Sequence, residues 1–329
     1  MLTDRYGRKI NYLRLAVIDR CNLRCTYCMP GEGLTWLNKK ELLNDEEIIR
    51  LAGILVELGI RKIRITGGEP FVRKDILHLL KELSGIPGLD ELTLTTNGIL
   101  TAPFIPKLKE IGIKSLNLSL DTLDEYRFHQ ITRRKGLNQV LETLQSLQEH
   151  QIKVKINAVV MDGINIDDIF PLVRLTEQKD IDVRFIEEMP FNGTNEPHHS
   201  LKWDYLQILN HIKTEFPSIS KIADPLHATA YSYQIPGFVG KVGIIAAFTR
   251  SFCGSCNRLR ITPTGDLRTC LYDNRGTNLK EAIRGNMPVT EIKKLIVEAV
   301  QQKAENGWEA ERGSAGNKSF HESMANIGG

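Results

Sequence analysis

Three cysteines lie within eight residues near the start of the chain: Cys21, Cys25 and Cys28. Thiolates this close together can form a disulfide, bind a zinc ion or hold an iron–sulfur cluster. A closed zinc site needs four ligands, and no histidine or further cysteine lies nearby in the sequence. A cluster of four irons held by three cysteines would leave one iron without a protein ligand. That open position is where chemistry could occur.

The same spacing, i, i+4 and i+7, would also fit the buried face of a helix. Asn22, Pro30 and Gly31 disfavour a long helix here, so we interpret the cysteines as ligands. All six cysteines of the chain fall into two triplets. This grouping indicates metal ligation in a reducing compartment rather than a disulfide framework, and we expect a cytoplasmic protein.

The second triplet consists of Cys253, Cys256 and Cys270. A turn signal over 263–266 separates two short strand-like runs and predicts a hairpin, which would bring Cys270 back toward the other two. Zinc ribbons use such an arrangement, so zinc is the alternative at this site. Zinc would need a fourth ligand, and His227 is the closest histidine in the sequence.

The elements that must position these residues alternate between strand and helix. Strands are expected at 12–18, 62–66, 92–97, 116–121, 153–160 and 183–187. Helices are expected at 44–59, 75–83, 106–111, 137–149 and 167–177. Repeated strand–helix alternation predicts a parallel sheet built from right-handed crossovers.

The strands carry polar residues on one face only. Lys62, Arg64 and Thr66 alternate with Ile63 and Ile65, and the other strands follow the same pattern. A closed eight-stranded barrel would fill its interior with apolar side chains. Six strands with polar inner faces instead predict an α/β fold, an incomplete (β/α)6 TIM-type barrel whose lumen holds a ligand. An antiparallel sheet with one solvated face is the alternative, which the intervening helices disfavour.

The predicted lumen is cationic. The basic residues on the polar faces of the strands are Arg14, Lys62, Arg64, Lys155 and Arg184. Burying several cations with few carboxylates is costly unless an anion joins them, so a phosphorylated small molecule is the expected ligand. Arg258 and Arg260 are two residues apart on a strand beside the second triplet, and they would point the same way. The sequence contains no P-loop, so side chains would hold the phosphates.

The strand–helix pattern ends near residue 191. We expect the partial barrel over 1–191 and a smaller α+β region with the second cysteine site over 192–329. Loops are expected over 191–199 and 309–318. The net charge of +3 is too small to indicate a nucleic-acid partner, no apolar run reaches transmembrane length, and the N-terminus shows no apolar signal region.

The spacing Cys-x3-Cys-x2-Cys, with Tyr27 before the last cysteine, resembles the radical S-adenosylmethionine (radical SAM) superfamily. The Gly-Gly-Glu-Pro run at 67–70 resembles the segment of those enzymes whose backbone pairs with the amino group of SAM. Together with the segments 19–30, 64–70, 95–98 and 184–187, the second triplet and the terminal glycine pair, the chain resembles the GTP 3′,8-cyclase family of molybdenum cofactor biosynthesis.

The resemblance implies two 4Fe–4S clusters as cofactors, together with SAM. The first cluster would be held by Cys21, Cys25 and Cys28, and the second, facing the guanine of GTP, by Cys253, Cys256 and Cys270. The implied SAM contacts are Tyr27, Gly68, Ser119 and Met189. The implied GTP contacts are Arg14, Arg64, Thr95, Lys155, Arg258 and Arg260. The implied catalytic residues are Arg258, Arg260, Gly328 and Gly329.

The resemblance also implies a reaction, that of a radical SAM lyase. A 5′-deoxyadenosyl radical derived from SAM takes hydrogen from C3′ of GTP, and the carbon radical attacks C8 of guanine to give 3′,8-cyclo-7,8-dihydro-GTP. The implied partners are a flavodoxin-type reductant and a cyclic pyranopterin monophosphate synthase that receives the product; the chain could be a monomer or a homodimer. The alternatives are a radical SAM enzyme that modifies a peptide and a zinc-stabilised binding module without catalysis.

Overall fold

The computed structural model describes residues 1–191, 201–314 and 322–328. Apart from Phe191, the loop expected over 191–199 lies outside the described residues, and so does Gly329. Strands and helices alternate through the first part of the chain, as predicted. The strands are β1 (Tyr12–Ala16), β2 (Lys62–Thr66), β3 (Glu91–Thr96), β4 (Ser115–Ser119), β5 (Lys153–Val160) and β6 (Ile181–Glu187). The helices are α1 (Asp45–Leu58), α2 (Ile76–Ser84), α3 (Ile105–Ile111), α4 (Glu125–Thr132), α5 (Leu137–Glu149) and α6 (Ile169–Arg174).

Local sequence sets the ends of α1. The side chain of Asn44 accepts the N–H of Glu47 at 2.8 Å, and the Glu47 carboxylate accepts the N–H of Asn44 at 2.9 Å. This reciprocal capping box satisfies two amides that the helix itself cannot. The helix ends at Gly59, whose φ of 118° is a left-handed conformation that glycine adopts readily. Both ends lie where the sequence predicts them.

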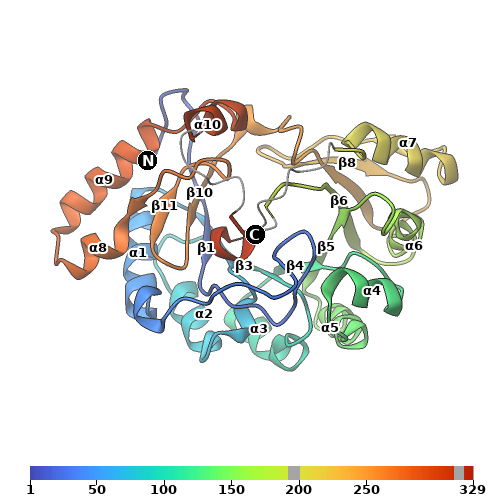
Figure 1. The fold of residues 1–329 in the computed structure, drawn as a ribbon, viewed down its shortest axis with the longest axis horizontal. Helices are drawn as coiled ribbons and strands as arrows, with labels where there is room; N and C mark the ends of the chain where they lie inside the picture. The colour runs from blue at the N-terminus through green and yellow to red at the C-terminus, as the bar shows by residue number, and fades with distance from the viewer. Residues whose placement is uncertain (192–200, 315–321, 329) are drawn as a thin grey trace.

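The described strands form one open sheet. Its order is β12-β11-β10-β1-β2-β3-β4-β5-β6-β9-β8-β7, and β1 to β6 pair in sequence order and in parallel. Helices α1 to α6 lie along its outer side, and the C-terminal end of the described chain lies near the middle of the arc (Figure 1). The sheet is not closed, because its edge strands β12 and β7 do not pair in the described part of the chain. An open partial barrel is therefore confirmed.

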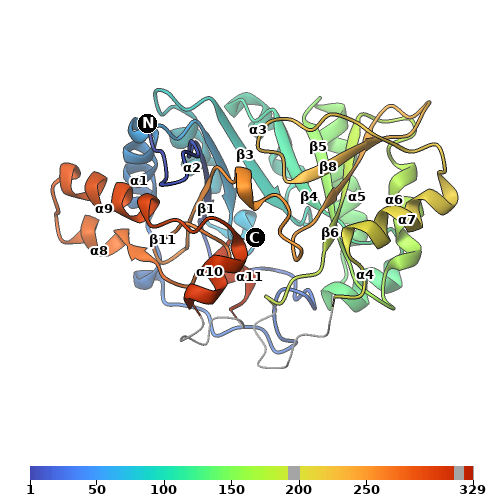
Figure 2. The same cartoon turned by 90° about the horizontal axis from the view of Figure 1, so that it is seen from above.

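The C-terminal region extends both edges of this sheet. Strand β10 pairs in parallel with β1, and β9 pairs in parallel with β6. The remaining strands are β7 (Ser220–Lys221), β8 (Ala230–Gln234), β9 (Lys241–Ile245), β10 (Arg258–Ile261), β11 (Asp266–Arg268) and β12 (Thr277–Asn278). The remaining helices are α7 (Tyr205–Glu215), α8 (Leu279–Arg284), α9 (Val289–Gln301), α10 (Gly307–Ser314) and α11 (Met324–Ile327). Helices α8 and α9 pack beside α1 (Figures 1 and 2). A domain boundary at 191/192 stays a prediction.

Alternate strand positions are buried to different degrees, as the polar faces predict. Along β5, Val154 and Ile156 are fully buried beneath the helices, whereas Lys155 between them is half-buried. The same alternation runs along β6, where Val183 is fully buried and Arg184 is half-buried. The apolar face of each strand therefore builds the core, and the polar face borders an interior space.

Several helices were not expected, among them α4 and α10. Helix α4 precedes α5, and its N-terminus is capped by the Asp124 carboxylate, which accepts the N–H of Arg127 at 2.8 Å. The prediction of a loop over 309–318 is wrong for residues 309–314, because α10 continues to Ser314. Asn306 starts α10 by accepting the N–H groups of Trp308 and Glu309, each at 3.0 Å. Both helices are short and polar, so apolar periodicity gives them no signal.

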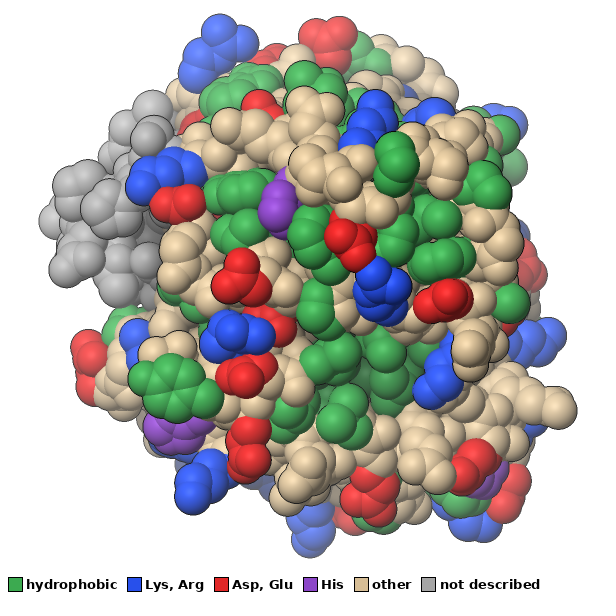
Figure 3. Space-filling view, turned by 90° about the vertical axis from the view of Figure 1, so that its right-hand side faces the viewer, with side chains coloured by type: hydrophobic (Ala, Val, Ile, Leu, Met, Phe, Trp, Pro, Cys, Tyr) green, Lys and Arg blue, Asp and Glu red, His purple; other side chains and the backbone are tan. Residues whose placement is uncertain are grey.

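The face of the molecule on the side of α6 and α7 carries interspersed basic and acidic side chains, with hydrophobic side chains between them (Figure 3). Within residues 1–191, 201–314 and 322–328, no helix has the length and apolar character needed to cross a membrane.

Glu187 should be critical for stability because it joins the barrel to the C-terminal region. Its fully buried carboxylate accepts the N–H of Tyr205 and the N–H of Thr249, both at 2.8 Å. We expect Glu187→Ala to lower the free energy of unfolding by about 3 kcal/mol, because buried amides lose their acceptor. Urea denaturation measures this change, with the exposed Glu298→Ala as control. Equal stability of the two variants would show that Glu187 does not stabilise the junction between the barrel and the C-terminal region.

Candidate active site

The first cysteine triplet lies on a loop that follows β1. The loop is coil and turn, so the alternative of a helix face is wrong. The N–H groups of Cys28 and Met29 donate to the carbonyl of Cys25 at 2.9 and 3.1 Å, which folds the three cysteines around one turn. All three thiols are free.

Helix α4 holds this loop in place. The N–H of Arg24 donates to Thr132 O, and the N–H of Thr26 donates to Ile131 O, each at 2.9 Å. The Arg133 guanidinium donates to the carbonyls of Arg24 and Met29, both at 3.0 Å. An unexpected helix therefore positions the loop that sequence reasoning placed at the centre of the chemistry.

The turn after β2 packs directly against the same loop. The N–H of Gly68 donates to Ile18 O, and the N–H of Glu69 donates to Arg20 O, both at 2.8 Å. A Cβ at Gly68 would lie 2.2 Å from Arg20 O, far inside van der Waals contact. Only glycine fits there. The Gly-Gly run is therefore a close contact between two backbones.

Two carboxylates that sequence reasoning did not single out complete the support of the loop. Glu69, which is buried, accepts the N–H of Asn97 at 2.7 Å and the hydroxyl of Thr96 at 2.8 Å, so it ties the end of β2 to the end of β3. Asp121 accepts the phenol of Tyr27 at 2.8 Å. Asp121 lies two residues beyond the end of β4 and continues the polar alternation of the strand expected over 116–121, which was the available signal.

The second triplet borders the interior, and its hairpin forms as predicted. Strands β10 and β11 pair antiparallel, with Arg260 opposite Arg268, and this returns Cys270 toward Cys256. His227 Nδ1 lies 2.8 Å from the carbonyl oxygen of Ser255, the residue before Cys256. All three of these thiols are free.

The electrostatic surroundings of the two triplets differ. Burial raises the pKa of Cys21 to about 11 and raises the pKa values of Cys25 and Cys28 further, where neighbouring thiolates add to the effect. Burial also raises the pKa of Cys256, but the charges of Lys303 and Arg258 outweigh it and lower the pKa to about 7. Three buried thiolates need cationic charge, which iron would supply at the first triplet.

Both triplets border one cavity of about 620 Å³. Such a volume lies within the range of roughly 300–1,000 Å³ that small-molecule sites occupy. Nearly all the predicted site residues line it: Arg14, Cys21, Cys25, Tyr27, Cys28, Arg64, Gly68, Thr95, Ser119, Lys155, Met189, Cys253, Cys256, Arg258, Arg260 and Cys270. The structure thus brings together residues from both halves of the chain.

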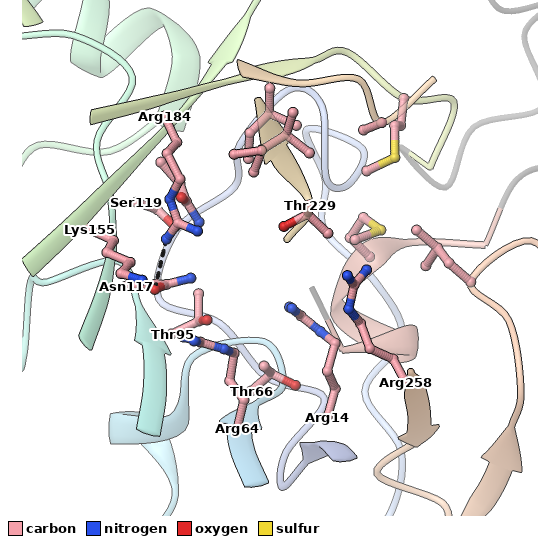
Figure 4. A pocket seen from close by; sticks show the side chains of 18 of the residues that line it. Arg14, Arg64, Thr66, Thr95, Asn117, Ser119, Lys155, Arg184, Thr229 and Arg258 are labelled. Carbon is pink, nitrogen blue, oxygen red and sulfur yellow. Dashed lines mark hydrogen bonds between the residues drawn. The ribbon is translucent and has the colours of Figure 1, made fainter. Parts of the chain in front are cut away.

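Cations converge on the space between the triplets. Figure 4 shows Arg14, Arg64, Lys155, Arg184 and Arg258 directed toward a common centre. Lys155 lies 4.0 Å from an Asp182 oxygen, whereas the arginines of the lumen have no carboxylate within ion-pair distance in the described part of the chain. Burial lowers the pKa of both Arg14 and Arg184 to about 10. This interior favours an anion strongly.

Several buried polar atoms of the cavity have no hydrogen-bond partner among the described residues. They are Arg14 Nε, Thr66 Oγ1, Thr95 Oγ1, Asn157 Oδ1, Asp182 Oδ1 and Arg184 Nε. Buried polar groups are rarely left unpaired, so a ligand rich in oxygen and nitrogen atoms fits the space that they border. These atoms lie on the predicted polar faces.

The C-terminal segment reaches both sites. Ser323 donates its hydroxyl to Cys28 O at 2.6 Å, and Met324 lines the cavity. Arg260 donates to Gly328 O at 2.6 Å. Gly328 has φ 85°, and a Cβ there would lie 2.8 Å from Thr66 Oγ1, so this position also requires glycine. Gly329 lies outside the described residues.

The residues present fit two iron–sulfur clusters. Each site offers three free cysteines at the edge of a shared cavity, and thiolates are the usual protein ligands of such clusters. Within the described ranges, no group of three or more histidine, cysteine, aspartate or glutamate side chains is arranged to hold a single metal ion. Cluster ligands each bind a separate iron and need not converge in that way.

Comparisons with known proteins agree with this geometry. Residues 15–176 match the model of the Radical SAM superfamily, and residues 181–308 match Molybdenum Cofactor Synthesis C. A GTP 3′,8-cyclase of Peptoclostridium acidaminophilum is 43% identical over 307 residues, covering 92% of each chain. Molybdenum cofactor biosynthesis protein 1 of Mus musculus is 42% identical over 303 residues, covering 92% of this chain but 48% of its own length.

Among solved structures, Streptococcus suis SuiB shares the fold, with a TM-score of 0.63 and 15% identity over 96% of this chain and 76% of that one. The fold, the cysteine loop and the match to the superfamily define a radical SAM protein. The chain belongs to the family whose members include GTP 3′,8-cyclase and molybdenum cofactor biosynthesis protein 1. It spans about half the length of the animal members.

Gly68→Ala should disrupt the first site selectively. The added methyl group must push the cysteine loop away from the turn after β2, so we expect the iron content to fall by about four atoms per chain. Gly53→Ala on α1 is the control, because a Cβ there meets nothing within 4 Å. Full iron content in Gly68→Ala would show that the loop tolerates the shift.

Tyr12→Phe should change the pH dependence of stability. Burial raises the pKa of Tyr12, but Arg64, whose Nε donates to the phenol at 2.6 Å, and Arg14 outweigh it and lower the pKa to about 7. The unfolded value is about 10, so ionisation of Tyr12 stabilises the fold increasingly between pH 7 and 10, and this stabilisation is lost as the pH falls through 7.

Over that range, the ligand-free wild type should gain up to about 1.4 kcal/mol per pH unit relative to Tyr12→Phe. Chemical denaturation at pH 7, 8 and 9 measures the difference. The exposed Tyr126→Phe should behave like wild type. Parallel pH profiles for wild type and Tyr12→Phe would show that the phenol stays protonated.

Proposed function

We propose that this chain is an enzyme, a GTP 3′,8-cyclase of molybdenum cofactor biosynthesis. The observation that carries the proposal is one cavity bordered by two cysteine triplets, with arginines between them that form no ion pair among the described residues. The phosphates of a nucleoside triphosphate would supply negative charge to balance these arginines. Its oxygen and nitrogen atoms would accept hydrogen bonds from the unpaired donors. A peptide substrate would supply less negative charge to this interior.

The residues would divide the work as follows. Cys21, Cys25 and Cys28 would hold one 4Fe–4S cluster, and the second triplet would hold another. When bound, the first cluster and SAM would supply the radical that removes hydrogen from C3′ of GTP and so leads to attack on C8. The proposed SAM contacts are Tyr27, Gly68, Ser119 and Met189.

The chain's own contribution to catalysis is positioning and electrostatics. Arg14, Arg64, Thr95 and Lys155 would bind the phosphates and ribose from one wall of the lumen. Arg258 would fix the substrate beside the second triplet. Gly328, held through its carbonyl by Arg260, would bring the terminal segment, with Gly329, against the substrate. Burial of the site would keep water away from reactive species.

The surroundings of the reaction follow from the same proposal. A flavodoxin-type reductant would supply electrons, and a cyclic pyranopterin monophosphate synthase would consume the product. Six free cysteines fit a reducing compartment such as the cytoplasm. A monomer and a homodimer are both compatible with the cavity, because one chain supplies all the residues named here.

The metal content after anaerobic purification tests the proposal directly. About eight irons with matching sulfide would fit two cubane clusters, and incubation with SAM, GTP and dithionite should then yield the cyclised nucleotide. GTP should also raise the melting temperature, because it binds only the folded chain. Zinc without iron, or iron without any effect of GTP, would reject the GTP 3′,8-cyclase.

Arg258→Ala and Arg260→Ala should separate the two half-reactions. Each removes a positive charge beside the second triplet and leaves the first cysteine loop intact, so we expect cyclisation to be abolished while uncoupled SAM cleavage continues. Chromatographic assay of 5′-deoxyadenosine and of the cyclised nucleotide measures both. The exposed Arg50→Ala is the control. Loss of SAM cleavage as well would mean that these arginines support folding or cluster binding.

A further inference from the structure

Lys303 is a buried lysine that the proposed function leaves unused. It follows α9, and only 2% of its surface is exposed. Its Nζ donates to Thr269 O in a short hydrogen bond and to Arg258 O at 3.2 Å. Thr269 directly precedes Cys270, and Arg258 lies two residues after Cys256. Lys303 therefore contacts the backbone beside two of the three cysteines of the second triplet.

The charge of Lys303 lacks a carboxylate partner. Among the described residues, none lies within ion-pair distance of its Nζ, whereas the buried Arg8 nearby has Asp4 at 2.6 Å. Carbonyl groups solvate an ammonium group only in part, so an isolated buried ammonium is costly for the fold. Such a charge is retained where an anion joins it.

The second triplet supplies the available anion. Lys303 donates to the carbonyl that directly precedes Cys270 and to the carbonyl two residues after Cys256, so its charge lies beside two of the three ligands. Three thiolates bound to a 4Fe–4S core leave a net negative charge, which grows when the cluster is reduced. Arg8 also contacts this triplet, through Cys253 O at 3.2 Å, but its charge is already balanced by Asp4.

We propose that Lys303 is a positioning residue of the second iron–sulfur site: its buried ammonium neutralises the charge of the group bound by Cys253, Cys256 and Cys270, and its hydrogen bonds fix the backbone next to those ligands. The proposal rests on the proposed function, which places a cluster there. Removing the positive charge should weaken retention of this cluster and make its reduction potential more negative.

The test compares Lys303→Gln with Lys303→Arg in the full chain. Glutamine keeps an N–H donor for one carbonyl but has no charge, whereas arginine keeps the charge. We expect wild type and Lys303→Arg to hold about eight irons after reconstitution, and Lys303→Gln about four, with uncoupled SAM cleavage retained at the first site. Lys280→Gln is the control: Lys280 is another buried lysine, and it donates to Glu41 O away from the cysteines.

The metal-free chains provide a readout that does not depend on activity. Below pH 6, where the cysteines of the metal-free chain are thiols, the ammonium has no anion beside it, so metal-free Lys303→Gln should melt no lower than metal-free wild type. A clearly lower melting temperature of metal-free Lys303→Gln would show that Lys303 mainly stabilises the fold by hydrogen-bonding two carbonyls. That result would overturn the proposal. Eight irons and an unchanged potential in Lys303→Gln would overturn it as well. A wild-type chain that holds only four irons would instead contradict both the proposed function and this inference.

Discussion

The structure depends on how it accommodates positive charges that face one another. Arginines from β1, β2, β6 and β10 point into a single interior, and in the described part of the chain none of them has a carboxylate within ion-pair distance. Their mutual repulsion is tolerable because the space between them is large enough for a charged ligand. Binding of an anionic ligand would therefore also relieve this repulsion.

The sheet places both sulfur sites at the border of that interior. The first loop follows β1, and the second triplet flanks β10 and β11. Because β10 pairs in parallel with β1, Arg14 lies directly opposite Arg260, and Tyr12 opposite Arg258. A strand from the C-terminal region thereby becomes part of the lumen wall, which a barrel of six strands alone would not provide.

Charge compensation recurs at smaller scale around the cavity. The phenol of Tyr12 lies against Arg64, and the ammonium of Lys303 lies beside the second triplet. In each case a buried charge depends on a neighbour that ionises or binds a cofactor. Glu69 and Asp121 act differently, since both carboxylates accept hydrogen bonds from neutral groups: Glu69 ties the end of β2 to the end of β3, and Asp121 holds Tyr27 of the cysteine loop.

The sequence by itself determined the cysteine triplets, the alternation of polar and apolar strand faces, and the capped ends of α1. These features are local: spacing and periodicity decide them within a few residues. Tertiary structure alone decided that β10 joins β1, that α4 holds the cysteine loop, and that Lys303 meets Thr269. Those contacts join residues far apart in the chain. Burial and backbone pairing in the folded protein select such contacts, and a local sequence pattern does not encode them.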